Sequence, residues 1–174
     1  DKTAAQAIVR DGETQKILPI AGISFEVLDS EGSQQSYNVY YPERKKYNRY
    51  ETTLTGRFYL PEKLPPDTYT LKNLSAPEDY DLAENTEFEV VLDHDWDDPI
   101  LVNAFLFPCK NTISISVSDA ENGAPVAGGQ YTVVAVDDVI TSDGTVRYRA
   151  GDAVATMACD GNGRAVTDEL YLGT

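Results

Sequence analysis

The chain has 174 residues, of which 29 are acidic and 14 are basic, and its formal net charge is −15. So large a negative charge argues against nucleic acid and anionic membrane as partners, because both carry charge of the same sign. No apolar run approaches the length that spans a bilayer, and the length of the chain suits one or two domains.

From the N-terminus onward, the sequence is dominated by alternating apolar and polar residues, rich in β-branched and aromatic side chains. Gly, Pro, Asn and Asp separate the alternating stretches, and helical patterns are almost absent. The predicted strands of the first part are roughly residues 6–10, 22–29, 36–41, 57–60, 68–73, 86–92 and 100–106. Seven short strands in about 100 residues are typical of an antiparallel β-sandwich.

The second part of the chain repeats the pattern of the first. The strand that begins at Gly22 recurs at Gly128, and the turn at Gly56 recurs at Gly163, both at a spacing of about 106 residues. The predicted strands of this part are roughly residues 112–118, 129–137, 146–149, 153–158 and 164–168. A repeat this long is a whole domain, so the sequence predicts an all-β fold of tandem antiparallel β-sandwiches.

The boundary between the two modules is predicted at Pro108, because proline cannot continue a central strand. Module one is then residues 1–107, and module two is residues 108–174. Module two ends at the counterpart of Thr68, so it lacks the strands that follow in module one. A sandwich without its closing strands has unpaired edges. Either another chain completes these edges, or the gap only reflects where this sequence stops.

Three motifs of module one, in this order, carry a family resemblance. They are Leu18-Pro-Ile-Ala-Gly-Ile-Ser-Phe25, Leu60-Pro-Glu-Lys-Leu-Pro-Pro-Asp-Thr-Tyr69 and Ala76-Pro-Glu-Asp-Tyr80. The chain resembles the Cna B-type or SpaA-like prealbumin-type domains of Gram-positive surface adhesins and pilins, in two tandem copies of which the second is incomplete. The competing interpretation is an unrelated immunoglobulin-like or transthyretin-like sandwich.

The resemblance implies where an internal isopeptide bond would form. In the family, a Lys on the first strand attacks an Asn on the last strand, and a buried carboxyl group moves the protons. Here the three positions correspond to Arg10, Asn73 and Asn103. Arginine stays protonated and cannot act as a nucleophile, and Asn73 cannot transfer a proton as a carboxyl group does. Lys16 and Glu78 lie nearby, but in a turn and an exposed loop, so we expect module one to lack the bond.

The two cysteines, Cys109 and Cys159, are not in a CxxC pair, and the chain has a single histidine, so the sequence does not predict a zinc site. A disulfide between Cys109 and Cys159 and two separate thiols both remain open, because spacing alone does not establish the geometry of the bond.

Residues 37–50 differ in composition from the rest of the chain. They contain five of the eleven tyrosines and four of the fourteen basic residues. Exposed aromatic residues beside cations favour contact with a protein or a sugar. The structural alternative is an inserted hairpin whose tyrosines pack on the sheet and whose cations protect an edge strand. The candidate contact residues are Tyr37, Tyr40, Tyr41, Arg44, Lys45, Lys46, Tyr47, Arg49 and Tyr50.

The densest acidic cluster is Asp93-His-Asp-Trp-Asp-Asp98, where closely spaced carboxylates suggest calcium. Its spacing does not fit an EF-hand loop, so a solvated hairpin loop is favoured. Asp160-Gly-Asn-Gly163 is typical of a turn. The sequence contains no nucleophile motif, phosphate-binding loop or paired-acid signature, so we expect no enzyme activity and no cofactor.

The favoured function is a structural stalk or adhesion module of a bacterial surface protein, on the cell wall or in a pilus, with neighbouring modules of that protein as partners. The alternative is a ligand-binding module that recognises a host protein or glycan through the hairpin of residues 37–50. A third class is a transthyretin-like accessory domain of a carbohydrate-processing enzyme, which requires a catalytic domain elsewhere in the protein.

Overall fold

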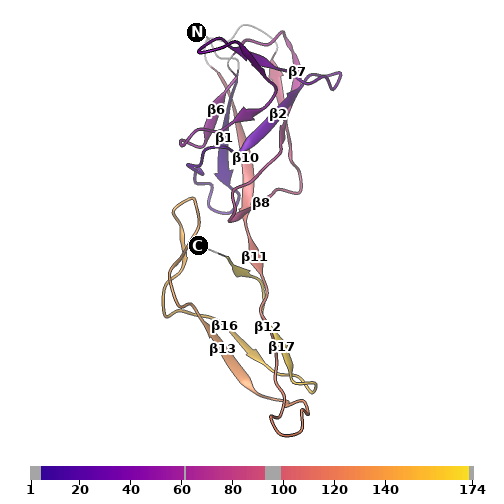
Figure 1. Cartoon of the computed structure of the whole chain (residues 1–174), viewed down its shortest axis with the longest axis vertical. Helices are drawn as coiled ribbons and strands as arrows, with labels where there is room; N and C mark the ends of the chain where they lie inside the picture. The colour runs from indigo at the N-terminus through magenta and orange to yellow at the C-terminus, as the bar shows by residue number, and fades with distance from the viewer. Residues whose placement is uncertain (1–4, 61, 93–98, 173–174) are drawn as a thin grey trace. The chain divides into compact units, whose positions relative to one another are not determined.

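The computed structural model describes residues 5–60, 62–92 and 99–172. The described residues form strands, turns and loops with no helix, which confirms the predicted all-β fold. The chain divides into two compact units, residues 1–107 (unit one) and 108–174 (unit two), and each is described by itself (Figure 1).

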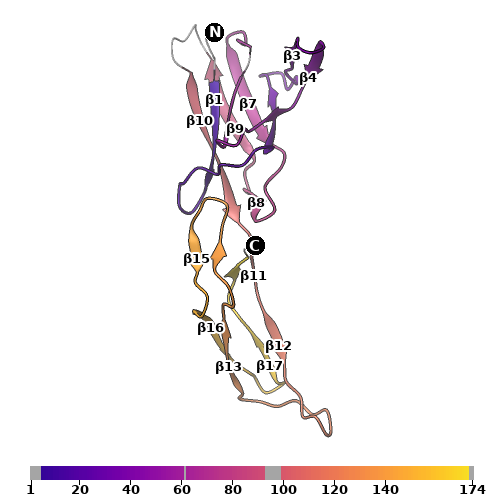
Figure 2. The same ribbon diagram turned by 60° about the vertical axis from the view of Figure 1, so that its left-hand side comes forward.

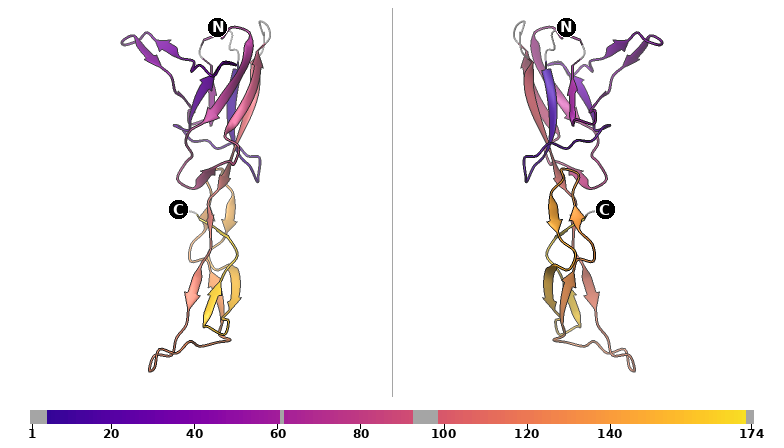
Figure 3. Two further views of the ribbon diagram at one scale, coloured as in Figure 1. Left: turned by 90° about the vertical axis from the view of Figure 1, so that its right-hand side faces the viewer. Right: turned by 90° about the vertical axis from the view of Figure 1, so that its left-hand side faces the viewer.

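Unit one is a sandwich of two four-stranded sheets, with strand orders β6-β1-β10-β8 and β5-β2-β7-β9. A separate two-stranded ribbon, β3-β4, projects from it (Figures 2 and 3). The strands are β1 (Ala5–Asp11), β2 (Ser24–Leu28), β3 (Tyr37–Val39), β4 (Lys45–Tyr47), β5 (Tyr50–Glu51), β6 (Arg57–Tyr59), β7 (Asp67–Asn73), β8 (Tyr80–Leu82), β9 (Glu87–Leu92) and β10 (Ile100–Pro108).

The first and last strands of unit one are neighbours and run parallel. β1 pairs with β10 over seven residues, with Ile8 opposite Asn103 (Figure 2). The sandwich is therefore not wholly antiparallel, which differs from the expectation. Strand β10 also runs through Pro108, because the proline stands at the end of the strand, where it interrupts no central pairing.

The core of unit one lies between the two sheets, where alternate residues of each strand meet. β1 contributes the small residues Ala5, Ala7 and Val9, all at most 1 % exposed. Phe25 of β2 and Leu71 of β7 face them from the other sheet and are as fully buried. The small side chains of β1 leave room for these larger ones, so the sandwich is held mainly by apolar burial.

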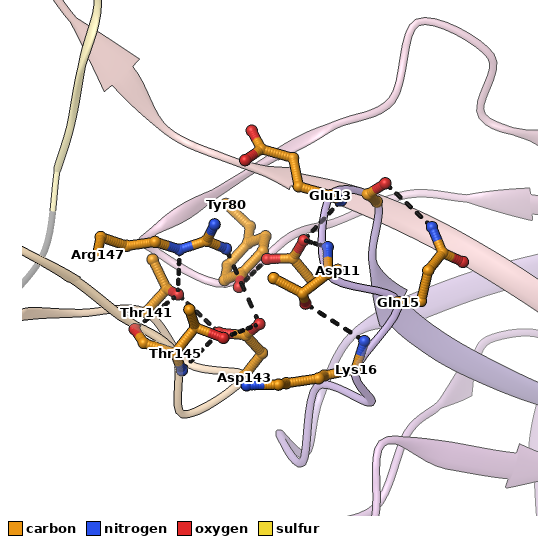
Figure 4. A network of polar contacts seen from close by, with 11 residues as sticks. Asp11, Glu13, Gln15, Lys16, Tyr80, Thr141, Asp143, Thr145 and Arg147 are labelled. Carbon is orange, nitrogen blue, oxygen red and sulfur yellow. Dashed lines mark hydrogen bonds and ion pairs between the residues drawn. The ribbon is translucent and has the colours of Figure 1, made fainter.

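A buried aspartate closes the first turn of unit one and joins it to β8. Asp11 Oδ1 accepts hydrogen bonds from the backbone N–H groups of Glu13, at 2.7 Å, and Thr14, at 2.9 Å. The Tyr80 hydroxyl donates to Asp11 Oδ2 at 2.7 Å (Figure 4). These bonds offset the cost of burying the carboxylate. Tyr80 is the last residue of the Ala-Pro motif, which therefore has a direct structural role.

Unit two is built from four strand pairs, β11–β18, β12–β17, β13–β16 and β14–β15. Its small core consists of Met157, Cys159 and Ala165, with Ile115 and Val133 partly buried against them. The strands are β11 (Lys110–Asn111), β12 (Ser114–Ser116), β13 (Gln130–Val134), β14 (Val139–Ile140), β15 (Val146–Tyr148), β16 (Ala153–Ala158), β17 (Arg164–Val166) and β18 (Leu170–Tyr171).

The β14–β15 hairpin of unit two is closed by side chains. Arg147 Nε donates to Thr141 Oγ1 at 3.0 Å, and this hydroxyl donates to Asp143 Oδ1 at 2.6 Å (Figure 4). The Arg147 guanidinium also lies 4.6 Å from the centre of the Tyr171 ring, within the range of a cation–π contact. This hairpin is thus fixed to β18.

Each unit has an equivalent backbone hydrogen bond at a corresponding place in its own sequence. In unit one, Val9 N donates to Gly56 O at 2.9 Å, and in unit two, Val117 N donates to Gly163 O at 2.8 Å. Both glycines have positive φ, +70° and +69°, and a Cβ atom on either would overlap a backbone carbonyl oxygen. The glycines that made the repeat visible in the sequence are therefore required by a close backbone approach.

We predict that Gly56→Ala destabilises unit one by about 1–3 kcal/mol more than Gly32→Ala does. Both glycines have positive φ, but a Cβ at Gly56 would overlap the Leu18 carbonyl oxygen, whereas Gly32 has open space around it. Urea unfolding of the whole chain, followed by amide hydrogen exchange in β1 and β6, measures the difference. Equal losses for the two variants would show that φ alone sets the cost.

Candidate functional site

The positions expected for an isopeptide bond do not meet in the interior of unit one. Arg10 and Asn103 lie on the outer face of the β6-β1-β10-β8 sheet, where Arg10 Nε donates to Asn103 Oδ1 at 2.9 Å. The Arg10 guanidinium also donates to the carbonyl oxygen of Gln15 at 2.9 Å. This face carries a noncovalent link between the first and last strands.

The residues of β1 and β10 that are adjacent to Arg10 and Asn103 and face the core are apolar. On β10 they are Val102, Ala104 and Leu106, and Val9 is the partner of Ala104 in the β1–β10 register. No amine or carboxamide therefore faces the core from these positions. Successive residues of a strand point to opposite faces, so Arg10 and Asn103 lie on the outer face while their neighbours Val9 and Val102 face the core.

Asn73 is the one expected position that does lie in the interior. It belongs to β7, opposite Phe25 of β2, and is only 3 % exposed. Its Oδ1 atom has no hydrogen-bond partner among the described residues. An unpaired buried carbonyl group costs free energy, and Asn73 lacks the ionisable carboxyl group that proton transfer requires.

The candidate contact residues form the β3–β4 ribbon and the strand that follows it. Tyr37 stacks on Tyr47, with ring centres 5.6 Å apart, and packs against Tyr50 at 5.0 Å. Tyr50 is 3 % exposed and packs on Phe58, which packs on Phe25 in the core. Burial raises the pKa of Tyr50 to about 12. A continuous row of aromatic rings thus ties the ribbon to the sandwich.

The end of the ribbon is exposed. Tyr40 is 68 % exposed and Tyr41 87 % exposed, and the Arg44 guanidinium lies 5.8 Å from the centre of the Tyr40 ring. Lys45, Lys46 and Arg49 are exposed as well. The structure therefore divides the predicted patch: Tyr37 and Tyr50 pack inward as the structural alternative expected, whereas Tyr40 and Tyr41 face solvent.

Two contacts that orient the ribbon have no signal in the sequence. The backbone N–H of Asn38 donates to Glu62 Oε1 at 3.1 Å, and Asn48 Nδ2 donates to Gln34 Oε1 at 3.2 Å. Both join residues 14 or more positions apart through exposed side chains. Neither residue pair has a composition or spacing that singles it out.

Cys109 and Cys159 are not joined by a disulfide in the structure. Cys159 is 6 % exposed, in the small core of unit two, and Cys109 is partly buried. The sequence left open either a disulfide or two separate thiols, and the structure has two separate thiols. A buried free cysteine in such a place packs as a small apolar residue.

The acidic cluster Asp93–Asp98, where calcium was considered, lies outside the described residues. Among the residues that are described, no group of three or more His, Cys, Asp and Glu side chains could hold a metal ion. Asp160 Oδ1 accepts hydrogen bonds from the backbone N–H groups of Asn162 and Arg164, which lower its pKa, so this segment is a turn. Within the described part, no helix is long and apolar enough to cross a membrane.

Comparison with known proteins identifies the family to which unit one is similar. The model of the SpaA family, a prealbumin-like fold domain, matches residues 8–101, which is more than half of the chain. No curated protein matches the chain.

Two solved structures are similar over nearly the whole chain. The Bacillus anthracis TIE protein has a TM-score of 0.57 and 17% identity, over 97% of this chain and 26% of that one. A streptococcal ancillary pilin has a TM-score of 0.50 and 13% identity, over 98% of this chain and 51% of that one. The chain thus spans about a quarter and about half of these two proteins, and at these identities the likeness shows the fold alone.

We predict that Asn73→Leu raises the free energy of unfolding of unit one by about 1 kcal/mol, because it removes an unpaired polar group from an apolar interior. Asn103→Leu is the matched control, since Asn103 is exposed and bonded to Arg10. Urea unfolding of the whole chain, with hydrogen exchange read at β2 and β7, makes the measurement. A loss of stability in Asn73→Leu would contradict the prediction.

Proposed function

Because the chain belongs to the family of SpaA prealbumin-like fold domains, we propose that it is a non-enzymatic structural module of a Gram-positive cell-surface protein. Its role is to space and stiffen a stalk, in a cell-wall-anchored or pilus-like assembly. Its direct partners are the neighbouring modules of the same surface protein. The acidic surface supports this role, since like charge keeps adjacent stalks apart.

One observation carries the proposal: the parallel pairing of β1 with β10. Because the strands are parallel, tension applied at the two ends of unit one pulls β1 and β10 in opposite directions along their axes. All hydrogen bonds of the seven-residue pairing then resist together, rather than opening one at a time. The Arg10–Asn103 side-chain bond spans the same two strands and adds to this resistance.

We predict that unit one resists tension along its strands better than tension across them. Pulling from the N-terminus and Phe107 shears the β1–β10 pair, whereas pulling from the N-terminus and Leu101, which lies opposite Gln6 near the start of the pair, peels it open. Single-molecule force measurements compare the two directions on the whole chain, with Cys109 and Cys159 changed to alanine and cysteines at the attachment points. We expect a several-fold higher unfolding force in shear. Equal forces in the two directions would contradict the stalk role.

We further propose that unit one has no intramolecular isopeptide bond. The outward positions of Arg10 and Asn103, and the apolar residues that face the core from β1 and β10, support this proposal. Burial can make a lysine amine neutral and nucleophilic, but neither arginine nor an alkyl side chain can take its place.

We predict that the intact mass of the reduced chain equals the mass calculated from its sequence, because forming the bond would release one ammonia. Digestion should also release the peptides of β1 and β10 separately. A species lighter by one ammonia, with these two peptides joined, would contradict the prediction.

For unit two, we propose a second module of the same fold that lacks its C-terminal strands. In unit one, β2 pairs with β5 on one side and β7 on the other, whereas the corresponding β13 pairs with β16 alone in the described part. A cavity of about 180 Å³ lies beside β13, with a largely apolar lining that includes Ile113, Val133 and Tyr148. A closing strand would fill this space with side chains.

The second candidate function is recognition of a host protein or glycan by the β3–β4 ribbon. The exposure of Tyr40 and Tyr41 favours it, since two adjacent, solvent-exposed tyrosines beside cations form a typical contact surface. This function is compatible with the stalk role, because the ribbon lies apart from the β1–β10 pair in unit one (Figure 2).

A further inference from the structure

The β3–β4 ribbon has the features of a binding site for one class of partner. We propose that an extended acidic peptide segment adds to the outer edge of β4, with Tyr40 and Tyr41 packing against it. The proposal rests on the second candidate function and names its ligand. The binding surface consists of Tyr40, Tyr41, Arg44, Lys45 and Lys46, and is called the ribbon surface below.

The first argument is the charge of the ribbon against that of the rest of the chain. Residues 37–50 hold four basic residues and one acidic residue, a charge of +3, whereas the whole chain carries −15, so the remaining residues carry −18. An acidic segment is therefore attracted to the ribbon and repelled elsewhere. This contrast directs such a partner to one place on the molecule.

The second argument is that the cations of the ribbon surface are available. None of Arg44, Lys45 and Lys46 forms an ion pair with another residue of the described part. The Arg44 guanidinium lies over the Tyr40 ring, which is itself part of the ribbon surface. An acidic partner can therefore bind these cations without displacing a carboxylate of the described residues.

The third argument is the unpaired backbone of β4, which favours a peptide over a glycan. Asn38 lies opposite Lys46, and the Asn38 N–H donates to Glu62 instead of crossing to β4. The Asn38–Lys46 pair is therefore a non-hydrogen-bonded pair, so the backbone N–H and C=O groups of Lys46 face the outer edge of β4. No hydrogen bond from these groups to a described residue is present. A third strand would pair them.

The fourth argument is that the ribbon is preorganised. The ring row Tyr47–Tyr37–Tyr50–Phe58 connects it to the core, and the Asn38–Glu62 bond fixes β3. A peptide that binds such a surface orders few side chains of the protein, which lowers the entropic cost of binding. The surface is much smaller than a standard protein interface, so we expect weak, strongly salt-dependent binding.

The test uses the whole chain and a fluorescein-labelled ten-residue peptide of alternating glutamate and threonine, with its lysine–threonine counterpart as a control. Fluorescence anisotropy at low and at high salt measures the binding. We expect the acidic peptide to bind at low salt and to lose at least about tenfold in affinity at high salt, and the basic peptide not to bind.

Two variants separate charge from strand addition. The triple change Arg44→Glu, Lys45→Glu and Lys46→Glu should weaken binding at least about tenfold, whereas the matched change Lys72→Glu, Arg149→Glu and Arg164→Glu, with the same change in net charge, should weaken it less than threefold. Lys46→Pro removes the outward N–H at an edge where proline is tolerated, and should weaken binding more than Lys46→Gln, which removes the same charge but keeps the N–H. Circular dichroism confirms that each variant is folded.

Several results would overturn the proposal: the acidic peptide does not bind, Lys46→Pro binds it as well as Lys46→Gln does, or the two triple variants lose affinity equally. A heparin fragment or sialyllactose that binds the ribbon in place of the peptide would also overturn it, while keeping the second candidate function. Sedimentation that shows self-association through the ribbon, without peptide binding, would identify a second copy as the partner instead. The pulling measurement on β1 and β10 does not involve the ribbon, so it tests the stalk role independently.

Discussion

The parallel pairing of β1 with β10 is the constraint on which unit one depends. It joins the two ends of the module's sequence, closes one of the two sheets, and places Val9 beside Ala104 inside the core. The same pairing determines which residues face outward, and so brings Arg10 to Asn103 on the solvent side. The packing of Val9 in the core and the contact of Arg10 with Asn103 on the solvent side therefore follow from one register.

The longer strands could be predicted from the sequence, because each shows several periods of alternation. β7 and β9 were expected at 68–73 and 86–92 and extend over Asp67–Asn73 and Glu87–Leu92. β4, β5 and β8 have only two or three residues and were missed, although the three-residue strands β3 and β6 lie within the predicted ranges 36–41 and 57–60. The parallel direction of β10 was missed because no local pattern encodes the partner of a strand.

The candidate site was predictable in composition but not in geometry. The concentration of tyrosine and cations in residues 37–50 identified the ribbon, yet it did not distinguish Tyr37, which packs inward, from Tyr41, which faces solvent. That distinction depends on Phe58 and Glu62, which approach the ribbon only in the folded chain. Likewise, the resemblance assigned roles to Arg10 and Asn103 by their order along the chain, but it did not show that both side chains lie on the outer face of the sheet.

The separation of β1 and β10 along the sequence also has a consequence for biosynthesis. About 95 residues lie between paired positions such as Ile8 and Asn103, so β1 leaves the ribosome long before its partner exists. Until β10 emerges, β6 is the one strand of the final sheet that is available to pair with the backbone of β1. The β1–β10 pair can therefore form only after the rest of unit one has been synthesised, and nascent chains interrupted before β10 would expose the edge of β1 to other chains.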